Sequence, residues 1–278
     1  MLICFGLDNR THKAGKGHRG RLGPGMALLL VLGAPTSGAA QDLLPPAENY
    51  TVRVEYLWWS PIPTGQIQKG LGDFEGTLLD IQEDLAVESG SANVLRGTFR
   101  LGGSWKLRGG WTSINFQGDT FADRPFLYGT LVARSGDQIV TSLKGNLISA
   151  DLEWDFLEQE WGFLGGLFGV RYFDIDTIMV NVATANRVAE TERLPIPVLG
   201  LAARAYLGER VSLEGEFAGI TAGSLGHLWE WLVAVRLHAT EQVAVTGGYH
   251  SLSLEGQDDR DFLSLKLSTW TFGLEISL

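Results

Sequence analysis

The 278-residue sequence contains 45% hydrophobic and 19% charged residues, together with 36 glycines and 9 tryptophans. This composition is too apolar for a disordered chain, and the sequence lacks the run of about 18 apolar residues that a transmembrane helix requires. The formal net charge of −10 disfavours nucleic-acid phosphate as a partner. A single large β-domain remains compatible with this length.

Residues 1–40 are predicted to be a secretory signal peptide. Several basic residues precede a short apolar run that starts at Met26, and the small residues Ser37-Gly-Ala-Ala40 follow it; this order is typical of a signal and its cleavage site. The long basic segment leaves open a translation start at Met26. The only cysteine, Cys4, lies in this leader, so no disulfide or cysteine metal site is expected in the secreted chain. Residues 41–49 are interpreted as a periplasmic lead-in.

From Tyr50 onward, apolar side chains recur at every second position, which is the signature of β-strands. Between Ile148 and Phe156 the even-numbered residues are apolar, whereas Asp151, Glu153 and Asp155 share the other face. The alternation predicts ten strands, at residues 50–59, 93–102, 104–117, 138–156, 161–174, 194–207, 211–221, 228–238, 242–254 and 263–277.

The connections between these strands alternate between short turns and longer loops. The longer loops are expected at residues 60–92, 118–137, 175–193, 222–227 and 255–262. This arrangement is typical of an antiparallel, up-and-down transmembrane β-barrel with both ends in the periplasm. The fold class predicted for residues 50–278 is therefore all-β, a single barrel of about ten strands, with eight to twelve left open.

Two details of this barrel are also predicted. The segment 71–93 either folds inward and closes the lumen further or forms a small extracellular cap. In the last strand, Leu263, Leu265 and Leu267 are out of phase with Trp270, so a β-bulge near Ser268 is expected to reconcile them.

A soluble β-barrel alternates in the same way, but three features favour a membrane barrel. The polar face of the strands carries charges of both signs, glycines are frequent inside strands, and aromatic residues gather near strand ends. Tryptophan and tyrosine are enriched where an apolar membrane surface meets water. The predicted aromatic girdle consists of Trp58, Trp105, Trp111, Trp161, Trp229 and Trp270.

The charges on the polar face are predicted to pair across a narrow lumen, because an isolated charge there is costly. This lumen charge network consists of Arg96, Arg100, Arg108, Asp151, Glu153, Arg171, Arg204, Glu214, Glu216, Glu230 and Arg236. Since a ten-stranded barrel is nearly filled by its own side chains, a plugged lumen is favoured over a narrow pore. Removing Arg236 together with Glu230 is expected to open such a plug.

Two motifs resemble those of small outer-membrane β-barrel proteins of bacteria, and in particular an uncharacterised group of such barrels. The first is Thr77-Leu-Leu-Asp80-Ile-Gln-Glu-Asp84-Leu85, whose acidic box is Asp80 and Asp84, and the second is Tyr172-Phe-Asp-Ile-Asp176. The resemblance implies an outer-membrane location and a closed antiparallel barrel, but it implies no activity. The final Ile-Ser-Leu278 departs from the Phe or Trp that ends many such barrels.

Catalytic and metal sites are less favoured. His250 with Ser251, Ser253 and Glu255 suggests a membrane hydrolase, but adjacent strand residues point to opposite faces, so His250 cannot pair directly with either serine. The acidic loop around Asp80 and Asp84 has the oxygen ligands that calcium prefers, without the spacing of a calcium loop. No catalytic residue, metal or cofactor is therefore predicted.

The composite prediction is a protein of the bacterial outer membrane with a structural or interaction role in the envelope. A narrow passive pore for small solutes or ions is the alternative, and a membrane hydrolase is the second alternative. The expected partners are outer-membrane lipid and lipopolysaccharide, envelope chaperones and the barrel assembly machinery.

Overall fold

A computed structural model of the chain describes residues 48–258 and 260–278. The predicted signal peptide and residues 41–47 of the lead-in lie outside this part. Among the described residues, no helix is long and apolar enough to cross a membrane. Strands account for most of the described structure, and a 3-10 turn, η3 (Gly223–Leu225), joins two of them.

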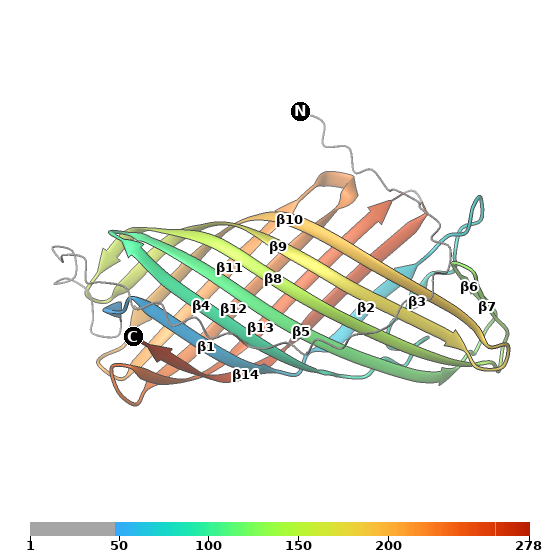
Figure 1. The fold of residues 1–278 in the computed structure, drawn as a ribbon, viewed down its shortest axis with the longest axis horizontal. Helices are drawn as coiled ribbons and strands as arrows, with labels where there is room; N and C mark the ends of the chain where they lie inside the picture. The colour runs from blue at the N-terminus through green and yellow to red at the C-terminus, as the bar shows by residue number, and fades with distance from the viewer. Residues whose placement is uncertain (1–47, 259) are drawn as a thin grey trace, which may run out of the picture. The chain divides into compact units, whose positions relative to one another are not determined.

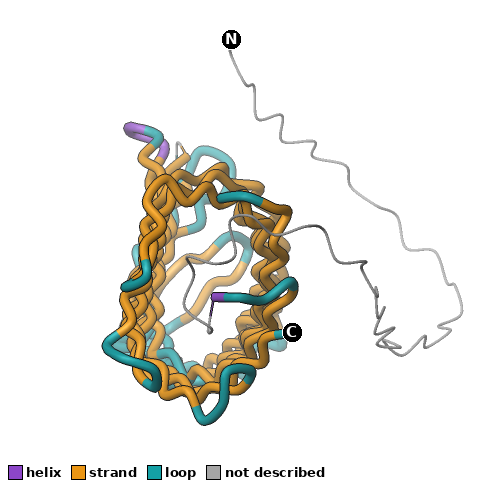
Figure 2. The backbone as a smooth tube through the Cα atoms, turned by 90° about the vertical axis from the view of Figure 1, so that its left-hand side faces the viewer, coloured by secondary structure: helices purple, strands orange, loops and turns teal. Residues whose placement is uncertain are grey.

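Antiparallel strands close into one ten-stranded barrel, which Figure 2 shows end on. The barrel strands are β1 (Val52–Trp59), β4 (Ser91–Gly102), β5 (Trp105–Phe121), β8 (Gln138–Gln159), β9 (Gly162–Asn181), β10 (Asn186–Tyr206), β11 (Val211–Thr221), β12 (Gly226–His238), β13 (Val243–Asp258) and β14 (Asp261–Ser277). Each pairs with the next in this order, and β1 closes the ring by pairing with β14 (Figure 1). The prediction of an antiparallel, ten-stranded barrel is confirmed.

The first long connection adds two strands to the barrel wall. β2 (Ile62–Gln68) pairs with β14 in the same register as β1, so the two form one strand interrupted at residues 60–61. β3 (Leu79–Asp80) pairs with β2, and Val87 then bridges to Gly118 on β5. The segment therefore fills the space between β2 and β5 as part of the barrel wall. Its apolar side chains are buried in the interior, so the predicted inward fold holds for these side chains and not for the backbone.

Two of the predicted long loops are wrong. β9 and β10 continue until only residues 182–185 separate them, and the pairing of β13 with β14 extends to Asp258 and Asp261. The connection predicted at 222–227 is found at residues 222–225. The loop expected at 118–137 instead extends β5 and contains a short hairpin, β6 (Phe126–Tyr128) and β7 (Leu131–Ala133). The strands β8, β9 and β10 have 22, 20 and 21 residues, about twice the 9–11 that a tilted strand needs to cross a bilayer, so they continue beyond the apolar belt.

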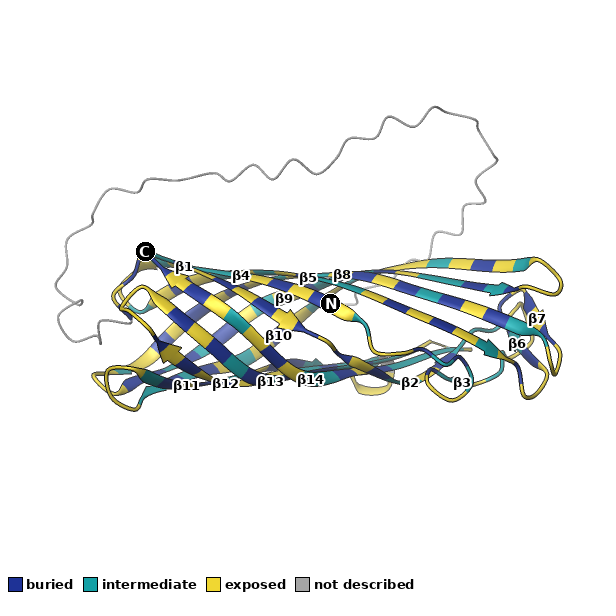
Figure 3. Ribbon diagram, turned by 90° about the horizontal axis from the view of Figure 1, so that it is seen from below, coloured by how far each residue is buried: buried dark blue, intermediate teal, exposed yellow. Residues whose placement is uncertain are grey.

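The strands have opposite polarity in their two halves. Near the turns at 103–104, 160–161, 207–210 and 239–242, here called the membrane section, outward residues are apolar and inward residues are polar. Toward the other end, here called the extension, inward residues are apolar and outward residues are polar. Buried and exposed residues alternate along the strands in both regions (Figure 3). The two longest connections, residues 60–90 and 122–137, lie at the end of the extension. Because the longer loops of outer-membrane barrels are extracellular, the extension is expected to be the extracellular end.

Strand β14 passes through both regions without changing phase. Thr271 and Glu275 are buried inside the membrane section, whereas Leu265 and Leu267 are buried inside the extension. The pairing of β14 with β13 shows no register shift, so the predicted bulge near Ser268 is wrong. The apparent phase change arises because β14 leaves the apolar belt near Ser268. Beyond this residue the outer face of the strand is polar and the inner face is apolar, the reverse of the membrane section.

The extension has its own apolar core. Its fully buried members include Leu79, Leu131, Ile139 and Met179, each with an exposed fraction of 0%. They belong to one continuous cluster with side chains from β2, β5, β8, β9, β13 and β14. Burial of such side chains contributes about 1.5–3 kcal/mol each, so the extension is a packed body and not an open tube.

One edge of the extension remains unpaired. β10 pairs with β9 along its whole length, but β11 pairs with it only from Leu199 onward. Pro195 and Pro197 lie where this pairing stops, and proline, which lacks an N–H, is suited to an edge that offers no ladder hydrogen bond. Lys69 spans the adjacent gap, with its Nζ 2.8 Å from Asp261 and 4.0 Å from Glu190 on β10.

Candidate functional site: the charged lumen of the membrane section

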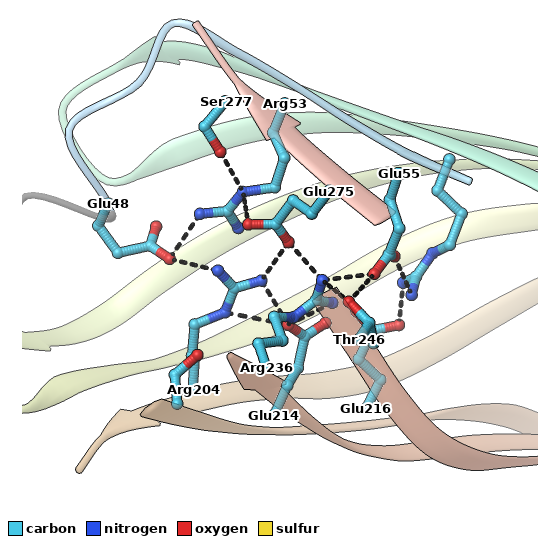
Figure 4. A network of polar contacts seen from close by, with 12 residues as sticks. Glu48, Arg53, Glu55, Arg204, Glu214, Glu216, Arg236, Thr246, Glu275 and Ser277 are labelled. Atoms are coloured by element: carbon cyan, nitrogen blue, oxygen red, sulfur yellow. Dashed lines mark hydrogen bonds and ion pairs between the residues drawn. The ribbon is translucent and has the colours of Figure 1, made fainter. Parts of the chain in front are cut away.

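Arg236 is the centre of an ion-pair network inside the membrane section (Figure 4). Its guanidinium contacts the carboxylates of Glu55, Glu214 and Glu275, which belong to three other strands. It also donates to Thr246 Oγ1 at 3.2 Å. Only 1% of Arg236 is exposed. Because a buried charge is tolerated only when it is paired and hydrogen-bonded, these contacts link five consecutive strands of the barrel, β11 to β14 and β1.

A second arginine, Arg204, extends the network toward the turns of the membrane section. Arg204 Nε donates to Glu214 at 3.0 Å, and Arg204 Nη1 lies 3.2 Å from Glu48. Arg53 on β1 also donates to Glu48, at 2.9 Å, and lies 3.3 Å from Glu275. Glu48 precedes β1, and its carboxylate points toward Arg53 and Arg204 in the network (Figure 4).

Toward β4, β5 and β8 the network continues through Glu216. This carboxylate contacts both Arg96 and Arg108. Arg96 also donates to Glu55 at 3.2 Å, and Arg108 donates to Glu153 at 2.7 Å. Because Glu216 comes from β11, these contacts cross the barrel from one wall to the other.

Lys106 is enclosed on the same side of the lumen. Its Nζ lies 2.8 Å from Glu153 and 2.6 Å from Asp155, both on β8. It also lies 3.5 Å from the centroid of the Phe163 ring, a cation–π distance. Lys106 is 2% exposed, so its charge is satisfied by the protein and not by water.

The upper boundary of the network is formed by Arg171. This residue donates to Asp151 and to Glu230, both at 2.7 Å. Glu230 Oε1 lies 3.0 Å from Nε2 of His250, whose ring packs against Trp59 with 4.4 Å between centroids. Charged residues thus meet the apolar core of the extension at this level.

A cavity of about 70 Å³ lies within the network. Its lining includes Arg96, Arg108, Arg171, Glu216 and Glu230. A cavity of this size has room for a few water molecules. The lumen is therefore narrow at this level and its side chains converge on one another.

Each member of the predicted lumen charge network faces the lumen and forms at least one ion pair there. The sequence-based set omitted Glu48, Arg53, Glu55, Lys106, Asp155 and Glu275, all of which take part. Apart from Glu48, these residues lie on the polar face of a membrane strand, and that alternation was the signal that could have identified them. Glu48 precedes the strands, and no periodic pattern marks it.

One predicted pair is wrong. Arg236 does not contact Glu230, because Arg236 lies opposite Thr246 while Glu230 lies higher on the same strand, opposite Leu252. Two residues on one side of a strand six positions apart are about 20 Å from each other. Each instead pairs with residues of other strands at its own level in the barrel.

The six predicted girdle tryptophans lie on the outer surface or in the turns. Trp58 and Trp270 are among the most exposed, at 67% and 64%. Trp105 stacks on Trp154 at 6.0 Å near the periplasmic turns. Trp231, next to the predicted Trp229, stacks on Tyr249 at 5.3 Å. These rings therefore lie on the outside of the barrel and not in its lumen.

The acidic box forms a turn in the extension. Asp80 Oδ1 accepts hydrogen bonds from the backbone N–H groups of Gln82 and Glu83, each at 2.9 Å. Asp84 Oδ2 accepts from the N–H of Asp80 at 2.8 Å and from Arg124 at 3.1 Å. Among residues 48–258 and 260–278, no cluster of three or more His, Cys, Asp or Glu suits a metal ion. The two carboxylates of the acidic box therefore stabilise this turn through hydrogen bonds.

The histidines do not assemble the triad considered from the sequence. His250 faces the lumen and contacts Glu230, whereas Ser251 takes the opposite side of β13. Glu255 lies 3.9 Å from His227. A different pair does meet: Ser212 Oγ is 3.0 Å from His238 Nε2. Ser212 is 0% exposed, so it offers no access to a substrate.

Comparison with solved structures relates this barrel to outer-membrane proteins. It is similar to the outer membrane protease OmpT from Escherichia coli, with a TM-score of 0.54 and 10% identity over 87% of this chain and 99% of that chain. Weaker matches include Ail of Yersinia pestis (TM-score 0.37, 10% identity, 82% and 97% coverage) and Neisserial surface protein A (0.34, 10%, 82% and 97%). No family model and no curated protein matches the sequence.

The fold and the surface together define a class. The chain is a closed, antiparallel β-barrel of the kind found in the bacterial outer membrane, with an apolar outer face along the membrane section. Identity of 10% to the solved structures describes a shared fold only, so the activities of those proteins are not transferred to this chain.

Proposed function

We propose that this chain is a non-conducting barrel of the outer membrane that anchors a rigid extracellular body and has a structural or interaction role in the envelope. The observation that carries the proposal is the presence of two consecutive seals in one lumen. The ion-pair network around Arg236 fills the membrane section, and the apolar core around Leu79 and Ile139 fills the extension. A solute that crosses the barrel would have to displace both the ion-pair network and the apolar core.

The partners expected of such a barrel follow from its surfaces. The apolar belt of the membrane section would contact lipid and lipopolysaccharide, and the acidic outer end of the extension would face the medium. Envelope chaperones and the barrel assembly machinery would deliver the chain, as for other barrels of this type. These partners are part of the proposal.

Single-channel recording in a planar bilayer tests this proposal. The refolded chain is expected to give no steady openings once insertion is verified by protease protection of the membrane section. Steady, ion-selective openings by the wild-type protein would contradict it.

A narrow pore is the alternative, and the cavity of about 70 Å³ is the observation that favours it. In that case Arg96, Arg108 and Glu216 would line the constriction, and neutralising Glu216 would change ion selectivity. The same recordings separate the two functions, because a sealed barrel has no selectivity to change.

A membrane hydrolase has less support. The likeness to a protease structure concerns the fold, and the Ser212–His238 pair is enclosed. Absence of peptide or ester turnover by the refolded protein, with His238→Ala as the comparison, would remove this alternative.

A further inference from the structure

The residue Glu48 occupies a basic pocket at the periplasmic mouth of the barrel. Its carboxylate lies 2.9 Å from Arg53, 3.2 Å from Arg204, 3.7 Å from Arg100 and 3.9 Å from Lys106. Only 1% of Glu48 is exposed. One carboxylate thus lies within 4 Å of four cations. Arg53, Lys106 and Arg204 also pair with other carboxylates, whereas among the described residues Arg100 forms an ion pair with Glu48 alone.

The pocket is built by the barrel, whereas its occupant comes from outside it. Arg53, Arg100, Lys106 and Arg204 belong to β1, β4, β5 and β10. Their positions follow from strand pairing and do not depend on the lead-in. Glu48 precedes the first strand and reaches the pocket by the path of the chain (Figure 4). Pocket and occupant are therefore separable.

The hydrogen bonds inside the pocket are incomplete. Tyr206 donates its hydroxyl to Glu48 Oε1 at 2.6 Å, and Arg53 donates to the same oxygen. In contrast, Glu48 Oε2, Arg204 Nη1, and both Nε and Nη2 of Arg100 are buried without a hydrogen-bond partner. The cations thus offer more donors than the tethered carboxylate can reach.

We propose that this pocket is a binding site for one carboxylate anion, which Glu48 fills in cis. A small free carboxylate such as formate or acetate has the same charge and the same two oxygens, and it lacks the tether. It would bind when the Glu48 side chain is removed, because Arg100 then loses the one carboxylate with which it pairs among the described residues, and a buried cation without an anion is strongly destabilising. The pocket lies at the mouth of the barrel, so anion binding there does not depend on whether the lumen conducts.

The test uses the refolded chain with Glu48→Ala, and Glu209→Ala in the exposed turn after β10 as a matched control. Thermal unfolding is followed by circular dichroism in detergent, in sodium formate and in sodium chloride at equal ionic strength. Glu48→Ala is expected to unfold at a lower temperature in chloride, and formate is expected to raise its Tm saturably by roughly 2–5 °C. For wild type and for Glu209→Ala, the Tm in formate is expected to equal the Tm in chloride.

Two further measurements keep the proposal open to refutation. Adding Arg100→Ala to Glu48→Ala is expected to remove most of the formate effect, since Arg100 contributes unpaired donors to the pocket. If Glu48→Ala does not fold in chloride, formate in the refolding buffer is expected to restore the folded protein. Equal effects of formate and chloride on Glu48→Ala, or no recovery of folding by formate, would overturn the proposal.

Discussion

The membrane section and the extension are formed by the same strands with the same alternation, but the apolar residues face outward in the first and inward in the second. On β8, the inward residues are Asp151 and Glu153 in the membrane section, but Ile139 and Leu143 in the extension. The outward residues change in the opposite sense, from Leu152 to Lys144. Strand geometry assigns each residue to a face, and the solvent outside each region decides which face is apolar.

This difference explains why the lumen needs two kinds of filling. In the membrane section the outer face already supplies the apolar surface, so the interior is held together by ion pairs between strands. In the extension the outer face contacts water, and the interior is stabilised by apolar burial. The barrel is thus a membrane protein and a water-facing β-protein joined along continuous strands.

The largest expected effect comes from breaking the network at its centre. Arg236→Ala would leave Glu55, Glu214 and Glu275 without their shared cation, and removing one partner of a buried ion pair costs about 3–5 kcal/mol. Urea unfolding in detergent micelles, with the exposed Arg187→Ala as control, measures this loss. A change below about 1 kcal/mol for Arg236→Ala would mean that the network does not stabilise the barrel.

A smaller effect would locate the boundary between the two regions. Leu274 and Ser264 share the outer face of β14, in the membrane section and in the extension respectively. Leu274→Lys is expected to cost about 2–4 kcal/mol of folding stability in lipid, since a lysine near the midplane of a bilayer is unfavourable. Ser264→Lys is expected to cost less than about 0.5 kcal/mol because this face is exposed to water. Equal costs at both positions would contradict the assignment.

The smallest effect concerns a surface turn of the extension. The backbone N–H of Arg134 and the side chain of Asn181 donate to Asp137 and lower the pKa of its carboxyl. Because the pKa is lower in the folded state, the stabilisation is present above the unfolded value of about 3.9 and is lost as the pH falls through the folded value. NMR titration of the Asp137 carboxyl is expected to give a midpoint below 3.9, and Asn181→Ala to raise it. An unchanged midpoint in that variant would show that Asn181 does not contribute.

The sequence carried enough information to predict the barrel and much of its lumen. Alternation placed residues such as Arg171 and Glu214 on the inner face, and their ion pairs then follow from strand neighbours. It did not predict the extension, because polar residues such as Asp174 and Asp176 resemble a loop when an apolar outer face is expected. Their inward neighbours Phe173 and Ile175 are buried in the extension core.

Two other features could not be obtained from periodicity. The contact of Glu48 with Arg204 joins residues far apart in the chain, and the lead-in has no strand pattern that would direct it into the lumen. The pairing of Arg236 depended on strand register, which alternation does not specify. To predict either contact, one would need to know which residues of different strands lie at the same height in the barrel.

The exchange of faces near Ser268 is most directly tested by a cysteine scan along the outer face of β14. Single cysteines are placed at positions 264, 266, 268, 270, 272 and 274 in a chain that carries Cys4→Ser, since Cys4 is the only native cysteine. The refolded proteins are inserted into lipid vesicles and treated with a membrane-impermeant maleimide. Labelling at 264, 266 and 268 with protection at 272 and 274 is predicted. Protection along the whole series, or uniform labelling, would contradict the two-region account.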